Sequence, residues 1–255
     1  MHKPIILIGV GEMGGVFARG LLRLGYPVYP VTRQMKLSDT AKAIKDAKLV
    51  LLAVGEQDLQ PLLSDIPAAW QNKLCLLQNE LLPEDWQGID KPTVISVWFE
   101  KKPGIEAKEI IPSPVYGPQA GLISDALSTL GMNTRTLHSP DDLLFELVLK
   151  NVYILTSNIA GLRTAGTVGV LWQEHRAFAR NLAAEVIQLQ ETLTGRSLDA
   201  NALILGMVRA FMGDPAHQCR GRRAPARLQR ALAHADRFGL PVPVMRELQA
   251  QQVAG

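Results

Sequence analysis

The sequence predicts an α/β domain followed by an all-helical domain. Up to about residue 137, short runs of branched apolar residues alternate with segments of helical pattern, as in a parallel sheet covered by helices. After Asp141 the strand-like runs stop and long helical segments follow. We place the boundary at His138-Ser139-Pro140, which gives domains of residues 1–138 and 139–255.

The composition indicates an ordinary globular protein. The chain has 255 residues, of which 47% are hydrophobic and 20% are charged. A net charge of +3 is too small to imply a nucleic-acid partner, and two cysteines do not make a disulfide framework. We find no apolar run of membrane-spanning length and no signal-peptide pattern, so we expect no membrane partner and a cytoplasmic location.

A glycine-rich turn organises the first domain. The apolar run Ile5–Ile8 leads into Gly9-x-Gly11-x-x-Gly14, and a helical pattern follows from Val16 to Leu24. Strand, turn and helix in this order form the Rossmann dinucleotide-binding fingerprint. Gly9 permits the tight turn, Gly11 lets a pyrophosphate approach the backbone, and Gly14 allows close packing of helix and strand. The alternative is a turn with a structural role alone.

The end of the second strand indicates which dinucleotide binds. Residues 27–32 form this strand, and Thr32-Arg33 follows with no acid before Asp39. An NAD site usually has an acid at this place, whereas an arginine can bind the 2′-phosphate of NADP through two hydrogen bonds. We therefore expect NADP. The alternative is that Arg33 is a solvated loop charge.

Later strand ends supply further candidate residues. We expect strands at 49–54, 74–77, 93–99, 109–111 and 134–137, with helices at 38–46, from 58 onward and at 122–130. Ligands bind beyond the carboxyl ends of parallel strands, and an asparagine there can bind a carboxamide or a small substrate. Asn79 could also simply close a turn. The candidate cofactor contacts are Gly9, Gly11, Glu12, Met13, Gly14, Thr32, Arg33, Val54, Gln57 and Asn79.

Lys150 lies in the first helix of the second domain. We expect helices at 141–162, 171–193, 200–211 and 224–238. Burying a lysine in so apolar a stretch is costly, so it either pairs with Glu146, four residues earlier, or extends to solvent. Asn158 lies two turns beyond it on about the same face. A lysine and an amide on one stripe suit keto-acid reduction, in which Lys150 stabilises or protonates the developing alkoxide.

These features resemble the ketopantoate reductase family across most of the chain. The resemblance implies that Lys150 is the general acid and that Asn158, on the same helix, holds the substrate, with Asn79 as a further substrate contact. It rests on the domain order and on four local anchors: Gly9-x-Gly11-x-x-Gly14, Thr32-Arg33, Gln78-Asn79, and Glu146-Leu147-x-x-Lys150 with Asn158.

The chain also departs from the family pattern. Ile154 stands where the family has a second asparagine, and Gly55 aligns near a family lysine. The family binds substrate with a serine and an acid in a late helix, but here no serine follows Ser197 and no acid lies between Asp214 and Asp236. The segment 238–243 does resemble the family's C-terminal end. We therefore expect the family's fold with a rebuilt substrate pocket, so ketopantoate need not be the substrate.

Arginines replace the late acid and serine. Three interpretations remain open: a solvated helix face, an anion pocket for a different substrate, or a nucleic-acid patch. The last ranks lowest because no aromatic residues interleave with the arginines. His217 and Cys219 alone do not make a metal site. The cluster comprises Arg220, Arg222, Arg223, Arg227 and Arg230.

The leading hypothesis is an NADP-dependent reductase of a small 2-keto acid or related carbonyl. A catalytically degenerate dinucleotide-binding protein, acting as a sensor or subunit, is the first alternative. An imine or amino-acid dehydrogenase is the second, because Rossmann folds support many chemistries. The long apolar helix at 141–162 further suggests a homodimer.

Overall fold

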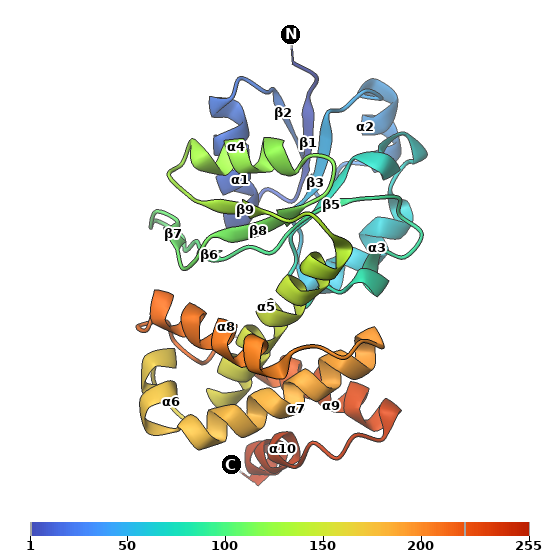
Figure 1. Ribbon diagram of the computed structural model, residues 1–255. Helices are drawn as coiled ribbons and strands as arrows, with labels where there is room; N and C mark the ends of the chain where they lie inside the picture. Colours follow the sequence, from blue (N-terminus) through green and yellow to red (C-terminus); the bar gives the residue numbers. More distant parts are fainter. Residues whose placement is uncertain (1, 222, 255) are drawn as a thin grey trace. The chain divides into compact units, whose positions relative to one another are not determined.

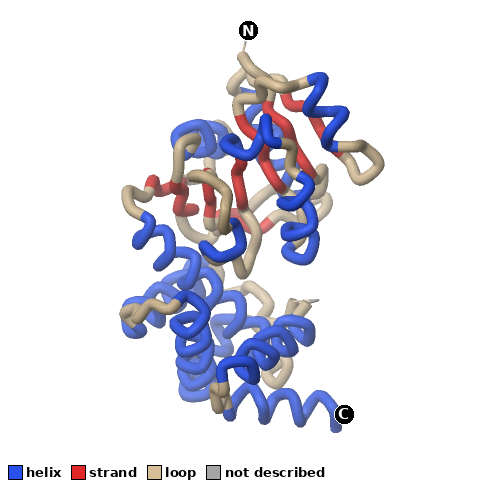
Figure 2. Tube along the Cα trace, turned by 90° about the vertical axis from the view of Figure 1, so that its right-hand side faces the viewer, coloured by secondary structure: helices blue, strands red, loops and turns tan. Residues whose placement is uncertain are grey.

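The structure, a computed structural model, describes residues 2–221 and 223–254. The chain forms two compact units, Met1–Glu146 and Leu147–Gly255. The division falls inside helix α5 (Pro140–Ala160), a few residues beyond the boundary expected from the sequence. Strands gather in the first unit and helices build the second (Figure 2).

A seven-stranded sheet forms the centre of the first unit (Figure 1). Its order is β2-β1-β3-β4-β5-β8-β9; β2 to β5 run parallel to β1, whereas β8 is antiparallel to β5. β6 and β7 pair as a separate two-stranded sheet. The strands are β1 (Ile5–Ile8), β2 (Val28–Val31), β3 (Leu49–Leu52), β4 (Leu74–Leu76), β5 (Thr93–Ile95), β6 (Phe99–Glu100), β7 (Lys108–Glu109), β8 (Ser113–Tyr116) and β9 (Thr134–Thr136).

Burial explains which runs become inner strands. Every residue of β1 and β3 is buried, as expected for parallel strands covered on both faces. β2 contains Pro30, which cannot donate to a neighbouring strand, and it lies at the edge of the sheet. The chain leaves β1 toward β2 on one side and returns to β3 on the other. The switch point beside β1 is where open α/β sheets bind ligands.

Helices α1 and α4 lie side by side against the sheet (Figure 1). Phe17 and Leu21 of α1 and Ile123 and Leu127 of α4 share a core cluster with Leu7, and each is at most 1% exposed. This core fixes the glycine-rich turn that precedes α1. The helical segments of the first unit are α1 (Glu12–Arg23), α2 (Leu37–Ala43), α3 (Glu56–Asp65), the 3-10 helices η1 (Ala68–Lys73) and η2 (Pro83–Trp86), and α4 (Ala120–Ser128).

Two features of the first unit differ from the sequence prediction. The expected strand 93–99 is divided into β5 and β6, and β8 was missed altogether. β8 reads Ser-Pro-Val-Tyr, too short and too polar at its start to stand out, yet its serine and valine are buried. Its partner β5 is close in space only because of the tertiary fold, so the local pattern could not reveal it.

Helix α7 contacts most of the other helices of the second unit, including α6, α8, α9 and α10. Buried polar contacts add to this packing: Asn151 of α5 donates to Gln190 of α7 over 2.8 Å. The expected helix 171–193 is divided at His175, and α10 was not predicted. Beyond α5, the helices are α6 (Val168–Glu174), α7 (Arg176–Thr194), α8 (Ala200–Gly213), α9 (Ala224–Phe238) and α10 (Pro243–Ala254).

Helix α5 is long and apolar enough to cross a membrane, contrary to the expectation that no apolar run of the sequence reaches that length. However, 89% of its most apolar window is buried within the structure, as in the core helix of a folded domain. Its apolar character is therefore accounted for by packing.

Candidate functional site

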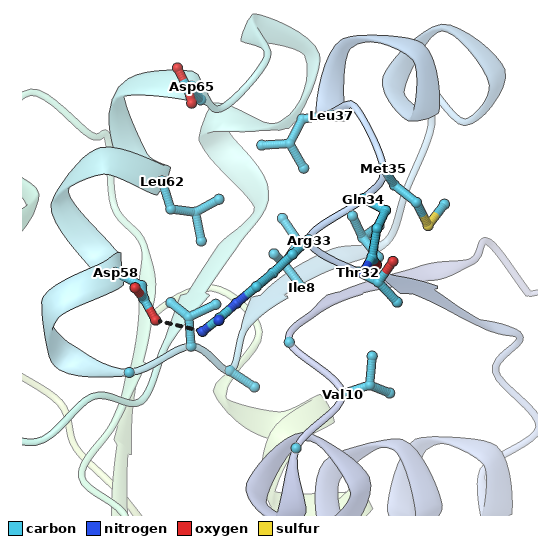
Figure 3. A pocket seen from close by; sticks show the side chains of 16 residues that line it. Ile8, Val10, Thr32, Arg33, Gln34, Met35, Leu37, Asp58, Leu62 and Asp65 are labelled. Carbon is cyan, nitrogen blue, oxygen red and sulfur yellow. Dashed lines mark hydrogen bonds and ion pairs between the residues drawn. The ribbon is translucent and has the colours of Figure 1, made fainter.

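A cavity of about 650 Å³ opens at the switch point, beyond the ends of β1, β2 and β3 (Figure 3). The turn after β1 supplies one wall, and the segment after β2 supplies another. The beginning of α3 closes a third side. The lining residues are Ile8, Gly9, Val10, Gly11, Val31, Thr32, Arg33, Gln34, Met35, Leu37, Ala53, Val54, Gly55, Asp58, Leu62 and Asp65.

The three glycines of the turn have different surroundings. Gly9 has a φ of +98°, and a Cβ there would lie 2.5 Å from the Ala53 carbonyl oxygen. A Cβ on Gly14 would overlap the carbonyl oxygen of Gly9. A Cβ on Gly11 would meet nothing within 4 Å. Folding therefore requires glycine at Gly9 and Gly14, whereas at Gly11 the space remains open to a ligand.

This turn fits the pyrophosphate of a dinucleotide. Gly11 is the N-cap of α1, so the first backbone amides of the helix have no partner within it, and the helix dipole is positive at this end. The acidic side chain at this end is balanced: Glu12 Oε2 lies 2.8 Å from Lys101 Nζ. An anion can therefore approach the turn without facing an unpaired carboxylate.

Arg33 extends across the cavity toward α3 (Figure 3). Its Nη2 donates to Asp58 Oδ2 over 3.3 Å. Asp65 also lines the cavity, at the other end of α3. The sequence predicted Arg33 but neither carboxylate, because nothing in the local pattern indicates which face of α3 turns toward β2.

The predicted cofactor residues fall into two groups. Gly9, Gly11, Thr32, Arg33 and Val54 line the cavity. The other five lie outside its lining: Glu12, Met13, Gly14, Gln57 and Asn79. Of these, Gly14 acts through packing, and Gln57 is exposed on α3, next to the lining residue Asp58.

Gln78 holds the end of β4 against the end of β3. Its side-chain amide donates to the Leu52 carbonyl over 2.6 Å, and its side-chain oxygen accepts from the Leu77 amide over 3.1 Å. Asn79 follows immediately and is half-buried, just before Glu80 turns the chain with a φ of +60°. Gln78 is thus a structural clamp that fixes the position of Asn79 beyond the strand.

Lys150 is half-buried on α5, and its surroundings alter its proton affinity. Burial, followed by the positive charge of Arg227, lowers the pKa of Lys150 from 10.5 to about 7. Its Nζ lies 5.5 Å from the centre of the Tyr153 ring. The expected pairing with Glu146 is wrong, because that carboxylate instead accepts from Arg135 Nη2 at 2.5 Å. Arg135 lies on β9, which the helical periodicity of α5 could not reveal.

Asn158 lies on the same stripe of α5 and is bound from α9. Arg227 Nη1 donates to Asn158 Oδ1 over 2.9 Å, and both side chains are buried. A Cβ on Gly221 would lie 2.6 Å from the same oxygen, so the segment before α9 passes closely over Asn158. The second unit therefore brings Lys150 and Asn158 together with an arginine that the sequence left unassigned.

No protein-family model matches the sequence, and no curated relative does. The structure is similar to 2-dehydropantoate 2-reductase from Methylococcus capsulatus, at 14% identity over 98% of this chain and 96% of the other, with a TM-score of 0.70. It is also similar to a dimeric ketopantoate reductase from Staphylococcus aureus, at 13% identity over 99% and 100% of the two chains (TM-score 0.64).

The chain has the ketopantoate reductase fold. A D-mandelate dehydrogenase solved with NADH has the same fold, at 15% identity over 96% of both chains with a TM-score of 0.67. The fold expected from the sequence is therefore confirmed, as a Rossmann-type α/β unit followed by a helical unit. The fold alone does not assign a substrate.

The residues that depart from the ketopantoate reductase pattern differ in how far they are buried. Ile154, which replaces an asparagine, is buried in α5 at 6% exposure. The arginine cluster does not behave as one solvated face: Arg220 and Arg223 are exposed, whereas Arg227 is 7% exposed. Arg230 is half-buried, and Arg222 lies outside the described residues.

Proposed function

We propose that the protein is an NADP-dependent reductase that transfers a hydride to a small 2-keto acid or related carbonyl. The observation that carries the proposal is Lys150, the only lysine after Lys108, with a pKa of about 7 on one helical stripe with Asn158. A general acid is most effective when its pKa lies near the working pH. The ketopantoate reductase fold supports the same reaction class.

The first unit supplies the cofactor site. Gly11 and the N-terminus of α1 would hold the pyrophosphate, and Arg33 would bind the 2′-phosphate. The apolar side chains of Val10, Leu37 and Leu62 offer walls against which a flat base can pack. NADPH, when bound, supplies the hydride.

The second unit supplies the proton and binds the substrate. Lys150 donates a proton to the carbonyl oxygen as that oxygen gains negative charge, and it regains a proton from water afterwards. Asn158 donates a hydrogen bond to the substrate. One carbonyl thus gains a hydride at carbon and a proton at oxygen, which gives an alcohol.

The decisive experiment compares Lys150→Met with the parent protein. NADPH binding is followed by fluorescence, and NADPH oxidation is followed after a pool of 2-keto acids is added. We expect the variant to bind NADPH like the parent but to lose at least about a hundredfold in turnover. Lys45→Met is the matched control, because Lys45 is an exposed lysine of the first unit. Turnover at the parent rate in Lys150→Met would remove Lys150 from the mechanism.

Two observations favour a second candidate, a dinucleotide-binding protein without turnover. Ile154 offers no hydrogen bond where the family has an asparagine, and Gly55 offers no charge where the family has a lysine. This candidate predicts tight NADPH binding with no oxidation on any carbonyl or imine substrate. Oxidation with one member of the pool decides for the reductase.

The proposal includes a homodimer in the cytoplasm. Leu205 and Met212 of α8 are 68% and 48% exposed, and they are seven residues apart on one side of the helix. The dimeric Staphylococcus aureus reductase supports the same assembly. Sedimentation as a monomer at micromolar concentration would contradict the dimer.

A further inference from the structure

The hairpin formed by β6 and β7 is bound to helix α1 by two ion pairs. In the first pair, Lys101 Nζ lies 2.8 Å from Glu12 Oε2. In the second, Arg19 donates from Nη1 and Nη2 to the two carboxylate oxygens of Glu106, over 3.2 and 2.9 Å. Glu12 and Arg19 are seven residues apart, so they lie on one face of α1, two turns apart. The hairpin therefore follows this face of α1 from its first turn.

The ion pair at the first turn is the less exposed of the two. The side chains of Lys101 and Glu12 are 17% and 46% exposed, against 41% and 80% for Arg19 and Glu106. A partly buried pair is screened by salt less than a pair in free solution. The Lys101 ammonium is also held by the hairpin itself, because it donates to the Lys102 carbonyl over 2.6 Å. Lys101 is thus fixed beside Glu12 instead of extending into solvent.

Glu12 lies where its negative charge affects an anionic ligand. It is the first residue of α1, directly after the N-cap Gly11, which lines the cavity and has open space around its Cα. An acid in the first turn stabilises a helix through the helix dipole. The same charge repels a pyrophosphate that approaches the turn. The hairpin supplies the cation that offsets this repulsion.

We propose that Lys101 is a positioning residue of the dinucleotide site, which sets the affinity for NADPH by holding and neutralising Glu12. This role of Lys101 rests on the proposed function. The β6–β7 hairpin is then a part of the cofactor site, although neither Lys101 nor Glu12 lines the cavity. Lys101 acts through the charge of Glu12 and not by contact with the phosphates. The net charge of the pair therefore determines the affinity.

A double-mutant cycle on the full chain tests this dependence on net charge. The dissociation constant of NADPH is measured by fluorescence titration at an ionic strength of about 0.1 M. We expect Lys101→Met to weaken binding about fivefold, because Glu12 is left as an uncompensated negative charge, and Glu12→Gln to tighten it. The double variant should bind within about twofold of the parent. A double variant as weak as Lys101→Met would mean that Lys101 contacts the phosphates directly, which would overturn the proposal.

Two control variants separate the charge at the turn from attachment of the hairpin. Arg19→Gln removes the second ion pair, about 10 Å further along the helix, so it should change NADPH affinity less than about twofold. Lys102→Met makes the same substitution at the next residue, whose ammonium pairs with Glu100 over 3.0 Å. It should also bind NADPH like the parent. Equal weakening in Lys101→Met and Arg19→Gln would show that only docking of the hairpin matters, and would overturn the proposal.

Salt provides a readout that a purely structural role would not change. The Debye length falls from about 10 Å at 0.1 M to about 3 Å at 1 M salt. The difference in affinity between Lys101→Met and the parent should therefore narrow at high salt. A folding defect in Lys101→Met would instead appear as a lower melting temperature and a difference that persists. A difference that is the same at both salt concentrations would contradict the role in neutralising charge.

The outcomes separate this role of Lys101 from the proposed function. NADPH affinity that follows the net charge of the pair supports the role even if no carbonyl is reduced. Reduction of keto acids with an NADPH affinity that is the same in Lys101→Met, Glu12→Gln and the parent would overturn the role while the reductase stands. Failure of the parent to bind NADPH would overturn both.

Discussion

Arg33 Nη2 lies 3.3 Å from Asp58 Oδ2, across the cavity that opens beyond β1, β2 and β3. The two side chains are 90% and 53% exposed. A surface pair of this kind contributes little stability, and a phosphate with two negative charges can displace the carboxylate. Asp58 thus holds Arg33 over the cavity, and a bound phosphate can take the place of Asp58 as the partner of Arg33.

Asp58→Asn should therefore favour NADPH over NADH. Removing the carboxylate releases Arg33 and takes away a negative charge that would repel the 2′-phosphate. We expect the ratio of the two dissociation constants to shift toward NADPH by about fivefold, a difference of about 1 kcal/mol. Fluorescence titration measures both constants, and Asp39→Asn is the control at an exposed acid bound to Lys42. Preference for NADPH that is unchanged in Asp58→Asn and in Arg33→Gln would remove Arg33 from phosphate recognition.

Substitutions in the glycine turn should separate folding from binding. A side chain on Gly11 meets open space, so Gly11→Val should leave the melting temperature close to that of the parent while weakening NADPH binding at least about tenfold. Gly14→Ala should instead lower the melting temperature, because its methyl group overlaps the Gly9 carbonyl. Thermal unfolding and NADPH titration of both variants test the contrast. Equal loss of stability in the two would contradict it.

The sequence predicted the parts of the fold that have a local cause. Gly9, Gly11 and Gly14 determine a turn, and the apolar runs that become β1 and β3 are buried because helices cover a parallel sheet. The sequence did not predict β8 or α10. β8 is stabilised by pairing with β5 and β9, and the first amides of α10 donate to a carboxylate of α7, so neither element has a strong pattern of its own.

The sequence predicted those residues of the candidate site that lie together on a single helix. The period of a single helix places Lys150 and Asn158 on one face. That period does not indicate which residues of other elements contact the face. Arg227 is 69 residues from Asn158 in sequence, and Arg135 is 11 residues from Glu146 on a different element. A signal did exist for Arg227: it occupies the late helix from which the family's acid is missing.

Removal of one buried carboxylate should detach the C-terminal helix. Glu185 of α7 accepts hydrogen bonds from the backbone amides of Val244 and Met245 over 2.7 and 3.0 Å, and so caps α10. Glu185→Ala leaves both amides without this partner. We expect a loss of roughly 1–3 kcal/mol in the free energy of unfolding, measured with urea. Glu174→Ala, outside this contact on α6, is the control.

Hydrogen exchange locates the effect of Glu185→Ala. Faster exchange should be confined to α10 and its contacts with α7 and α9. A variant with parent stability and unchanged exchange in α10 would show that the cap is unnecessary.

The proposed reductase activity should fall as pH rises through about 7. Lys150 donates its proton only when charged, and burial together with Arg227 lowers its pKa from 10.5 to about 7. Above that pH the protonated fraction falls tenfold for each pH unit, and kcat/KM for keto-acid reduction should fall with it. Arg227→Gln removes the neighbouring positive charge, so the fall should move to higher pH, whereas Arg237→Gln should leave it in place. A pH profile that is the same in all three proteins would show that Arg227 does not influence the ionisation of the acid. Parent activity that does not fall above pH 7 would show that Lys150 is not the acid.

Stability provides an independent check on the same ionisation. The folded-state pKa of Lys150 lies below its unfolded value, so between about pH 7 and 10.5 the unfolded chain binds more protons at this residue than the folded chain. The contribution of Lys150 to stability therefore increases as pH rises through this range. Lys150→Met removes that contribution, and its unfolding free energy should gain less than the parent's between pH 7 and 9. Parallel curves for the two proteins would mean that Lys150 keeps an ordinary pKa in solution.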